Sequence, residues 1–198
     1  MPYKPNNREY RSFNMSFDVD SNSEGGYIVE GYATTFDVPY AFGPEGCKEC
    51  IKRSALEGAD MSDVIFQLNH EGQTLARLRT NTLQLRVDDH GLWIRADLGG
   101  SQAGRDLYEA IKNRLIDQMS WGFNIAPEGW EWNEATRTST ITKVSKVFDV
   151  SAVSVPANSD TEIHARSYLD GVIEAEKQEL LLRDREERQR AALKLRLL

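Results

Sequence analysis

Apolar and polar residues alternate along much of residues 1–160. A period of two is typical of strands that bury one face, and short apolar runs between turn residues are typical of fully buried strands. These two patterns predict strands over residues 27–33, 64–68, 83–87, 92–96, 119–126, 139–146 and 147–155. The third and fourth should form a hairpin, because Asp-Asp-His-Gly at residues 88–91 has a turn composition. Residues 130–137 are predicted to be an exposed turn or a hairpin tip.

Two helices are expected among these strands. In residues 101–116, Leu107, Ile111 and Leu115 recur at a spacing of four, which is the apolar stripe of an amphipathic helix. A shorter helix is expected over residues 51–58. Many short strands with few helices predict a mainly β domain with flanking helices, whose strands form a closed or nearly closed barrel.

The pattern changes near Arg166. Residues 170–198 are rich in Glu, Arg, Leu, Ala and Gln and contain no proline, a composition that favours a long helix. Their apolar residues are too irregular for a strict coiled coil. The chain is therefore predicted to consist of a β domain over residues 1–165 and a charged helical C-terminal extension over residues 166–198. Two interpretations of the extension are left open: a solvated helix, and a segment that docks on another protein.

Composition and charge restrict the classes of partner. The chain has 198 residues, of which 40% are hydrophobic and 28% charged, as in ordinary soluble proteins. Its net charge of −7 argues against general nucleic-acid binding, which needs a basic surface. No run approaches the ~20 apolar residues of a membrane helix, and residues 1–11 lack the apolar stretch of a secretory signal. The sequence predicts an intracellular protein that binds neither nucleic acid nor membranes.

Cysteines and histidines give little support to a metal site. Cys47 and Cys50 supply only half of a zinc site, and no nearby His or Cys pair completes it. The three histidines, His70, His90 and His164, lack a ligand-like spacing. We predict two reduced thiols without a chemical role, in a loop or at a helix start, and neither a metal nor an organic cofactor.

Three short pieces carry candidate chemistry. They are residues 68–71 with His70, residues 119–123 with Ser120, and residues 148–158 with Asp149. A serine becomes a useful nucleophile when an imidazole takes its proton and a third group holds that imidazole. The chain order of histidine, serine and acid differs from the three common orders of serine hydrolases. By themselves, a histidine in phase with a strand and a serine within a strand are as compatible with structural roles as with catalysis.

Alternation also assigns the residues around Ser120 to two faces. Ser120 and Gly122 fall on one face of the predicted strand, and the large residues Met119, Trp121 and Phe123 fall on the other. The large residues can anchor the strand in a core, and the small ones leave room for a substrate backbone.

These pieces, with others in the same order and spacing, resemble the prohead maturation proteases of tailed bacteriophages. That family is related to the herpesvirus assembly protease, assemblin. The resemblance covers roughly residues 10–163 and includes residues 31–37 and 89–94. One difference is that residues 113–118, before Ser120, contain no glycine, which such sequences often carry there. The resemblance implies an assemblin-like closed β-barrel and a serine endopeptidase with Ser120 as nucleophile.

The resemblance also implies the roles of the other two residues. His70 would be the general base, and Asp149 stands where family members carry an acid. A buried carboxylate needs a partner, and the His70 imidazole is a suitable one. Assemblin uses a second histidine as its third member, so His164 stays open as an alternative, as do Asp117 and a dyad without a third group.

By the same resemblance, the substrates would be the scaffolding protein or the scaffold-like region of the major capsid protein, and the protease itself. Cleavage would take place inside the assembling procapsid in the host cytoplasm. Whether the protease forms a homo-oligomer is left open. Two rival functions remain. One is a non-enzymatic capsid assembly factor that binds scaffold through a β-barrel, and the other is a metal-dependent hydrolase.

Overall fold

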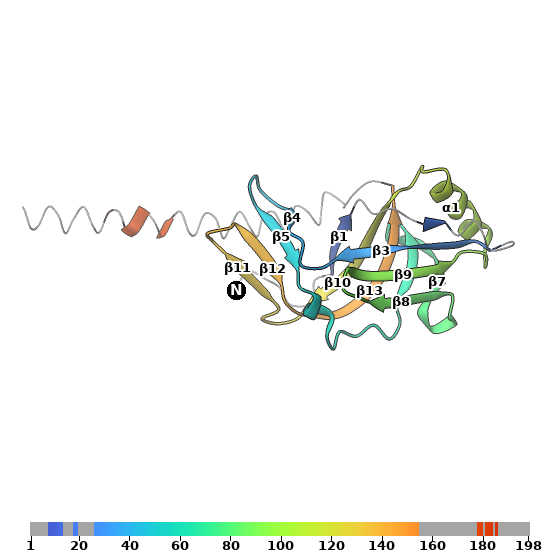
Figure 1. Cartoon of the computed structure of the whole chain (residues 1–198), viewed down its shortest axis with the longest axis horizontal. Coiled ribbons are helices and arrows are strands. Elements are labelled where there is room, and N and C mark those ends of the chain that lie inside the picture. Colours follow the sequence, from blue (N-terminus) through green and yellow to red (C-terminus); the bar gives the residue numbers. More distant parts are fainter. Residues whose placement is uncertain are drawn as a thin grey trace, which may run out of the picture.

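The computed structural model describes residues 8–13, 18–19, 26–154, 178–179, 181–183 and 185. It is mainly β, as predicted, with three sheets, the α-helix α1 (Gln102–Lys112) and the 3-10 helices η1 (Arg53–Leu56) and η2 (Leu78–Thr80) (Figure 1). The five-stranded sheet contains, in spatial order, β1 (Glu9–Phe13), β10 (Gln118–Ile125), β13 (Val144–Val153), β6 (Ile65–Leu68) and β7 (Glu71–Arg77). The β3 sheet contains β2 (Asp18–Val19), β3 (Ile28–Thr35), β9 (Gly91–Asp97) and β8 (Leu83–Val87). The β12 sheet contains β11 (Trp130–Asn133), β12 (Thr138–Ile141), β5 (Lys48–Ile51) and β4 (Tyr40–Ala41).

The hairpin predicted around residues 88–91 is confirmed. It joins β8 to β9, and the Asp88 carboxylate accepts hydrogen bonds from the backbone N–H groups of His90 and Gly91 at 2.9 and 3.1 Å. A side chain at Gly91 would place its Cβ 2.0 Å from the carbonyl oxygen of Thr34, so only glycine fits this approach of β9 to β3. The tip predicted over residues 130–137 is a hairpin that contains β11 and the turn to β12.

The predicted closed barrel is not found. Among the described residues, hydrogen-bonded pairing falls into three sheets with open edges. At one corner β7 and β8 contact each other, but η2 separates them along the chain and β8 pairs only with β9. The ladder does not continue because β7 is irregular: its register against β6 shifts, and Gly72 has a left-handed φ of 74°. The five-stranded sheet and the β3 sheet contribute to one core without joining into a single ladder.

The short helix predicted over residues 51–58 is present only in part, as the 3-10 helix η1 (Arg53–Leu56). Ile51 is the last residue of β5, and only the 3-10 turn η1 follows it. The reason is a parallel ladder in which Ile51 pairs with Ile141 of β12, which draws residues 48–51 into a sheet. Cys50 therefore lies in a strand, not in a loop or at a helix start.

Helix α1 is shorter than the predicted residues 101–116. Arg114 adopts a left-handed φ of 56° after it, and the N–H of Leu115 donates to the carbonyl of Ala110 at 2.9 Å, as in a Schellman motif. Leu115, which the sequence placed on the apolar stripe, is 75% exposed. Glycine is the usual residue at such a turn. Residues 113–118 contain no glycine, and here Arg114 occupies the left-handed position.

The core lies between the five-stranded sheet and the β3 sheet, with α1 at one end (Figure 1). From β10, Met119, Trp121 and Phe123 are fully buried, and the rings of the last two stack with centroids 3.9 Å apart. Burying each such side chain contributes about 1.5–3 kcal/mol. These three residues anchor β10 from the core side, as the alternation predicts, and they leave its other face to Ser120 and Gly122.

A buried ion pair joins β1 to the β12 sheet. The Arg11 guanidinium donates to both oxygens of the Glu49 carboxylate, from Nε at 2.5 Å and from Nη2 at 3.0 Å. The Tyr40 hydroxyl donates to the same carboxylate. Burial disfavours the charged form of Arg11, but the adjacent Glu49 raises the pKa of Arg11 above its ordinary value. The pair fixes β1 in place from the side opposite to Ser120.

Replacing Arg11 with methionine is expected to destabilise the fold by about 3–5 kcal/mol, because the Glu49 charge would stay buried without its partner. Chemical denaturation measures this loss. The double variant Arg11→Met with Glu49→Leu removes both charges and should regain most of the stability. A loss in the single variant below about 1 kcal/mol would show that the pair behaves like a surface pair.

The two-domain division into residues 1–165 and 166–198 stays a prediction. Within the extension, the described residues 178–179, 181–183 and 185 are helical and exposed, and Arg183 pairs with Glu179 at 3.0 Å. The rest of the extension lies outside the described residues. No helix in the described part of the chain is long and apolar enough to span a membrane.

Candidate active site

His70 lies at the tip of a tight hairpin. Strand β6 ends at Leu68 and β7 begins at Glu71, so Asn69 and His70 form a two-residue loop. Both have a left-handed backbone, with φ of 53° and 60°, as a type I′ turn requires. The sequence-based interpretation of His70 as a continuation of the strand is therefore wrong: the residue stands in the turn. A left-handed histidine costs about 1–2 kcal/mol, so its presence there is more consistent with a specific role than with packing alone.

The His70 turn is fastened to the end of β13. The N–H of Asn69 donates to the carbonyl of Ala152 at 2.9 Å, and the Asn69 side-chain oxygen accepts from the N–H of Ser154 at 3.0 Å. Leu68 pairs with Ala152 in the parallel ladder of β6 and β13. These bonds hold the imidazole of His70 at a defined position over the five-stranded sheet.

Ser120 and Asp149 lie on adjacent strands and on the same face of that sheet. In the antiparallel ladder of β10 and β13, Ser120 stands opposite Ser151 and Gly122 stands opposite Asp149. Both Ser120 and Asp149 are fully buried. The core residues of β10 point to the opposite face, so this face is free to carry polar side chains.

The three predicted residues meet in one chain of contacts. His70 Nε2 lies 2.6 Å from the Ser120 hydroxyl oxygen, and His70 Nδ1 contacts a carboxylate oxygen of Asp149. The His70 side chain is 12% exposed, whereas that of Asp149 is wholly buried. A hydroxyl, an imidazole and a carboxylate in this order are the arrangement that transfers a proton from a serine nucleophile to a histidine.

The Asp149 carboxylate is well supplied with partners. One oxygen accepts from His70 and, at 2.8 Å, from the hydroxyl of Ser151, and the other contacts Nη2 of Arg8. Burial alone raises the pKa of Asp149. The hydrogen bond and charge of His70, the charge of Arg8 and the Ser151 hydroxyl outweigh burial and hold that pKa below its ordinary value. The carboxylate is therefore ionised at neutral pH.

Three contacting residues were missed by sequence reasoning. Ser151, within the strand predicted over residues 147–155, donates to Asp149. Its position two residues after Asp149 puts it on the same face and was the available signal. Tyr10 of β1 places its ring 4.3 Å from the His70 ring, centroid to centroid. Arg8, before β1, gave no signal, because nothing in the local pattern connects it with residues far along the chain.

The alternatives for the third residue fare differently. Asp117 is exposed in the segment before β10, and the described contact of His70 Nδ1 goes to Asp149 instead. His164 lies outside the described residues. Asp149 therefore has the geometry of the third member.

No group of three or more His, Cys, Asp or Glu side chains able to hold a metal ion occurs within the described ranges. Cys47 and Cys50 are buried free thiols. The Cys47 sulfur accepts a hydrogen bond from Arg137 at 3.3 Å, and burial raises the pKa of the Cys50 thiol. Neither thiol contacts the three predicted site residues.

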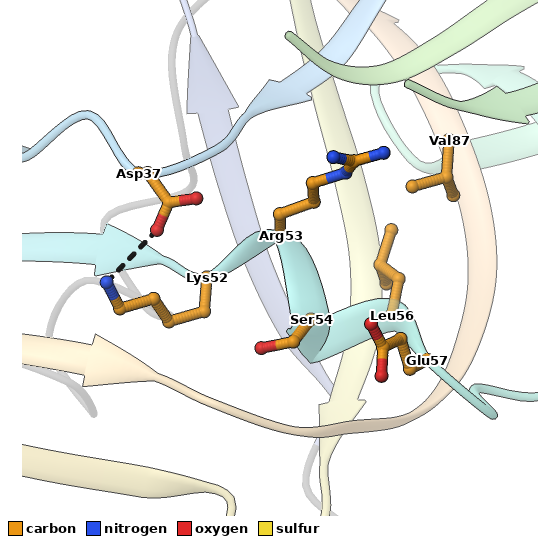
Figure 2. A pocket seen from close by; sticks show the side chains of 7 residues that line it. All are labelled: Asp37, Lys52, Arg53, Ser54, Leu56, Glu57 and Val87. Carbon is orange, nitrogen blue, oxygen red and sulfur yellow. Dashed lines mark ion pairs between the residues drawn. The ribbon is translucent and has the colours of Figure 1, made fainter. Parts of the chain in front are cut away.

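One cleft lies apart from the three residues. It has a volume of about 590 Å³ and is lined by Asp37, residues 52–54, Leu56, Glu57 and Val87 (Figure 2). Lys52 and Asp37 form an ion pair there at 3.1 Å, but both are half exposed, and such pairs contribute little. None of its walls comes from the three predicted site residues.

A second cleft, of about 530 Å³, opens beside the His70 turn. It is lined by residues of the β6–β7 hairpin on both sides of His70, together with Ala103 of α1. The Glu71 carboxylate is the charged group among its lining residues. Of the two clefts, only the second one adjoins the His70 turn.

Two comparisons with known proteins found matches. The family model described as caudovirus prohead serine protease matches residues 15–172. The prohead protease of Escherichia phage T5 is 26% identical over 159 residues, which make up 77% of this chain and 70% of the phage protein. No solved structure matches. The matched range spans His70, Ser120 and Asp149, whereas Arg8 and the whole of β1 precede it.

Proposed function

This chain belongs to the caudovirus prohead serine proteases, and we propose that it cleaves peptide bonds with Ser120 as nucleophile, His70 as general base and Asp149 as the orienting acid. The observation that carries the proposal is the unbroken contact from the Ser120 hydroxyl through both ring nitrogens of His70 to the Asp149 carboxylate. Three residues far apart in sequence meet in the order that acyl transfer to a serine needs.

The first half of the reaction forms an acyl-enzyme. The Ser120 oxygen attacks the carbonyl carbon of the substrate while its proton passes to Nε2 of His70, 2.6 Å away. The resulting imidazolium is stabilised by the Asp149 carboxylate at Nδ1. Collapse of the tetrahedral intermediate breaks the C–N bond, and the leaving amine takes the proton from Nε2.

The second half releases the acyl group. A water molecule gives a proton to Nε2 of His70 and attacks the ester carbonyl, and the proton then returns to the Ser120 oxygen as the carboxylic acid leaves. Asp149 holds the imidazole in the tautomer that leaves Nε2 free to accept a proton in both halves.

We further propose that the substrates are the scaffolding protein or the scaffold-like region of the major capsid protein, and the protease itself. The support is the name shared by the matching family and the phage relative, since a prohead is the unexpanded capsid precursor. Cleavage would then occur inside the assembling procapsid in the host cytoplasm. A homo-oligomer and a common fold with assemblin stay predictions.

The rival function is an assembly factor that has lost catalysis. Such a factor would have no need to keep a left-handed histidine in contact with a serine and a buried acid, because each of these features costs stability. Their joint presence favours the enzyme.

The test is to mix the protein with the capsid and scaffolding proteins of the same genome and to identify the products by mass spectrometry. We expect discrete new termini in those proteins, and their loss after treatment with a serine-directed phosphonylating reagent. A chelator should have no effect. Intact partners after long incubation would favour the assembly factor, and inhibition by the chelator alone would favour the metal-dependent hydrolase.

A further inference from the structure

We propose that Arg8 is a positioning residue of the active site, which holds the Asp149 carboxylate in the orientation that His70 needs. This inference rests on the proposed function of the three residues. It adds a fourth side chain, contributed by the segment immediately before β1, that acts on the reaction through Asp149 without contacting the substrate.

The division of contacts on the carboxylate carries the argument. One oxygen of Asp149 is engaged by His70 and Ser151, and the other contacts the Arg8 guanidinium. A carboxylate held at a single oxygen can rotate, whereas one held at both oxygens cannot do so without breaking a charged hydrogen bond. Arg8 therefore fixes the plane of the carboxylate, and through it the plane of the imidazole.

The strand between the two groups is shaped for this contact. At Gly122, which stands opposite Asp149, an added Cβ would lie 2.3 Å from the Asp149 oxygen that faces Arg8 and 2.9 Å from Nε of Arg8. Any side chain at this position would separate the arginine from the acid. The glycine is thus explained by the close approach of Arg8 to Asp149 across β10.

Arg8 itself is held from several sides. Its guanidinium carbon lies 4.7 Å from the ring centroid of Phe148 and 5.3 Å from that of Tyr10, which are cation–π distances. The adjoining strand is fastened by the buried pair of Arg11 and Glu49 on its other face. The Arg8 side chain is 35% exposed and Asp149 is not exposed at all, so the arginine brings its charge to the buried acid from the solvent side.

The charge of Arg8 has a consequence for pH dependence. The titratable and charged groups around the His70 ring are Asp149 of β13, Arg8 and Tyr10 at β1, and the exposed Glu71 that follows His70. Without the positive charge of Arg8, the pKa of Asp149 rises, so that this carboxylate takes up a proton at higher pH. The titration of the Asp149 carboxyl is therefore sensitive to the Arg8 contact.

The experiment compares Arg8→Gln and Arg8→Lys with the wild type, and uses Arg53→Gln as the matched control. Arg53 also pairs with an aspartate, Asp89, but both are exposed. For Arg8→Gln we expect kcat to fall roughly 10–100-fold with little change in KM. Arg8→Lys keeps the positive charge and should recover part of kcat, and the control should match the wild type.

A second readout does not depend on activity. In a Ser120→Ala background, carbon NMR of the Asp149 carboxyl should show its titration at higher pH when Arg8 is glutamine. An unchanged titration together with unchanged kcat overturns the proposal, as does a rise in KM alone, which would make Arg8 a substrate contact. If the titration moves although the wild type cleaves nothing, the Arg8 contact is supported and the proposed proteolysis fails.

Discussion

Replacing Ser120 with alanine is expected to lower the rate of peptide cleavage by roughly a million-fold, because the proposed nucleophile is lost. The change removes one oxygen from a buried position and only the 2.6 Å contact to His70, so the fold should persist. Mass spectrometry of the capsid and scaffolding proteins measures the cleavage, and circular dichroism checks the fold. Ser145→Ala, at an exposed serine on β13, is the matched control and should cleave normally.

The same experiment tests whether the residues act as one unit. His70→Asn keeps a residue that tolerates the left-handed backbone of the turn, and it should lose nearly as much activity as Ser120→Ala. The double variant should lose no more than either single one, because residues of one catalytic unit are not additive. Normal processing by the Ser120→Ala protein would remove Ser120 from the proposal.

Replacing Asp149 with asparagine is expected to lower kcat by about ten thousand-fold. The amide nearly preserves the shape of the side chain, but its nitrogen donates a hydrogen bond where the carboxylate accepts one. The Arg8 guanidinium can only donate, so the amide oxygen faces Arg8 and the amide nitrogen faces His70 Nδ1, to which it donates. The imidazole adopts the tautomer whose Nε2 already carries a proton, so it can no longer take the proton of Ser120. Steady-state kinetics on a peptide that contains the cleavage site measures the loss.

Asp117→Asn is the control for this second prediction. Asp117 is the exposed alternative acid before β10, and its replacement should leave kcat nearly unchanged. His164→Ala should also be nearly silent. A large loss in either control with activity retained in Asp149→Asn would transfer the role of third member to the other residue.

The buried strands could be predicted from the sequence because their apolar residues report burial directly. Strands β3, β6, β8, β9 and β10 follow alternation or apolar runs and lie where it predicts them. Strands β1 and β7 carry mostly polar residues at the two edges of the five-stranded sheet, and their sequences give no comparable signal. A barrel closes only when its edge strands pair with each other. The number of strands predicted from the sequence therefore could not tell whether the barrel closes.

The three site residues could be named from the chemistry of their side chains and from the resemblance, but their contacts could not. Alternation correctly put Ser120 on the face away from Trp121. It failed for His70, because the period of two does not reveal where a hairpin turns. The contact of Arg8 with Asp149 depends on the ladder of β1 and β10, which joins segments more than a hundred residues apart. Such a pairing leaves no trace in a local pattern.

The order of strands in the five-stranded sheet also sets when the protein can become active during synthesis. Strand β13 is the last of them to leave the ribosome, yet it lies in the middle, between β10 and β6, and it contributes Asp149. A nascent chain that ends before β13 therefore has the serine and the histidine but no strand to bring them together. Pairing of segments so distant in sequence is also slow. If Asp149 has the proposed role, cleavage activity therefore requires that the whole sheet be translated and folded.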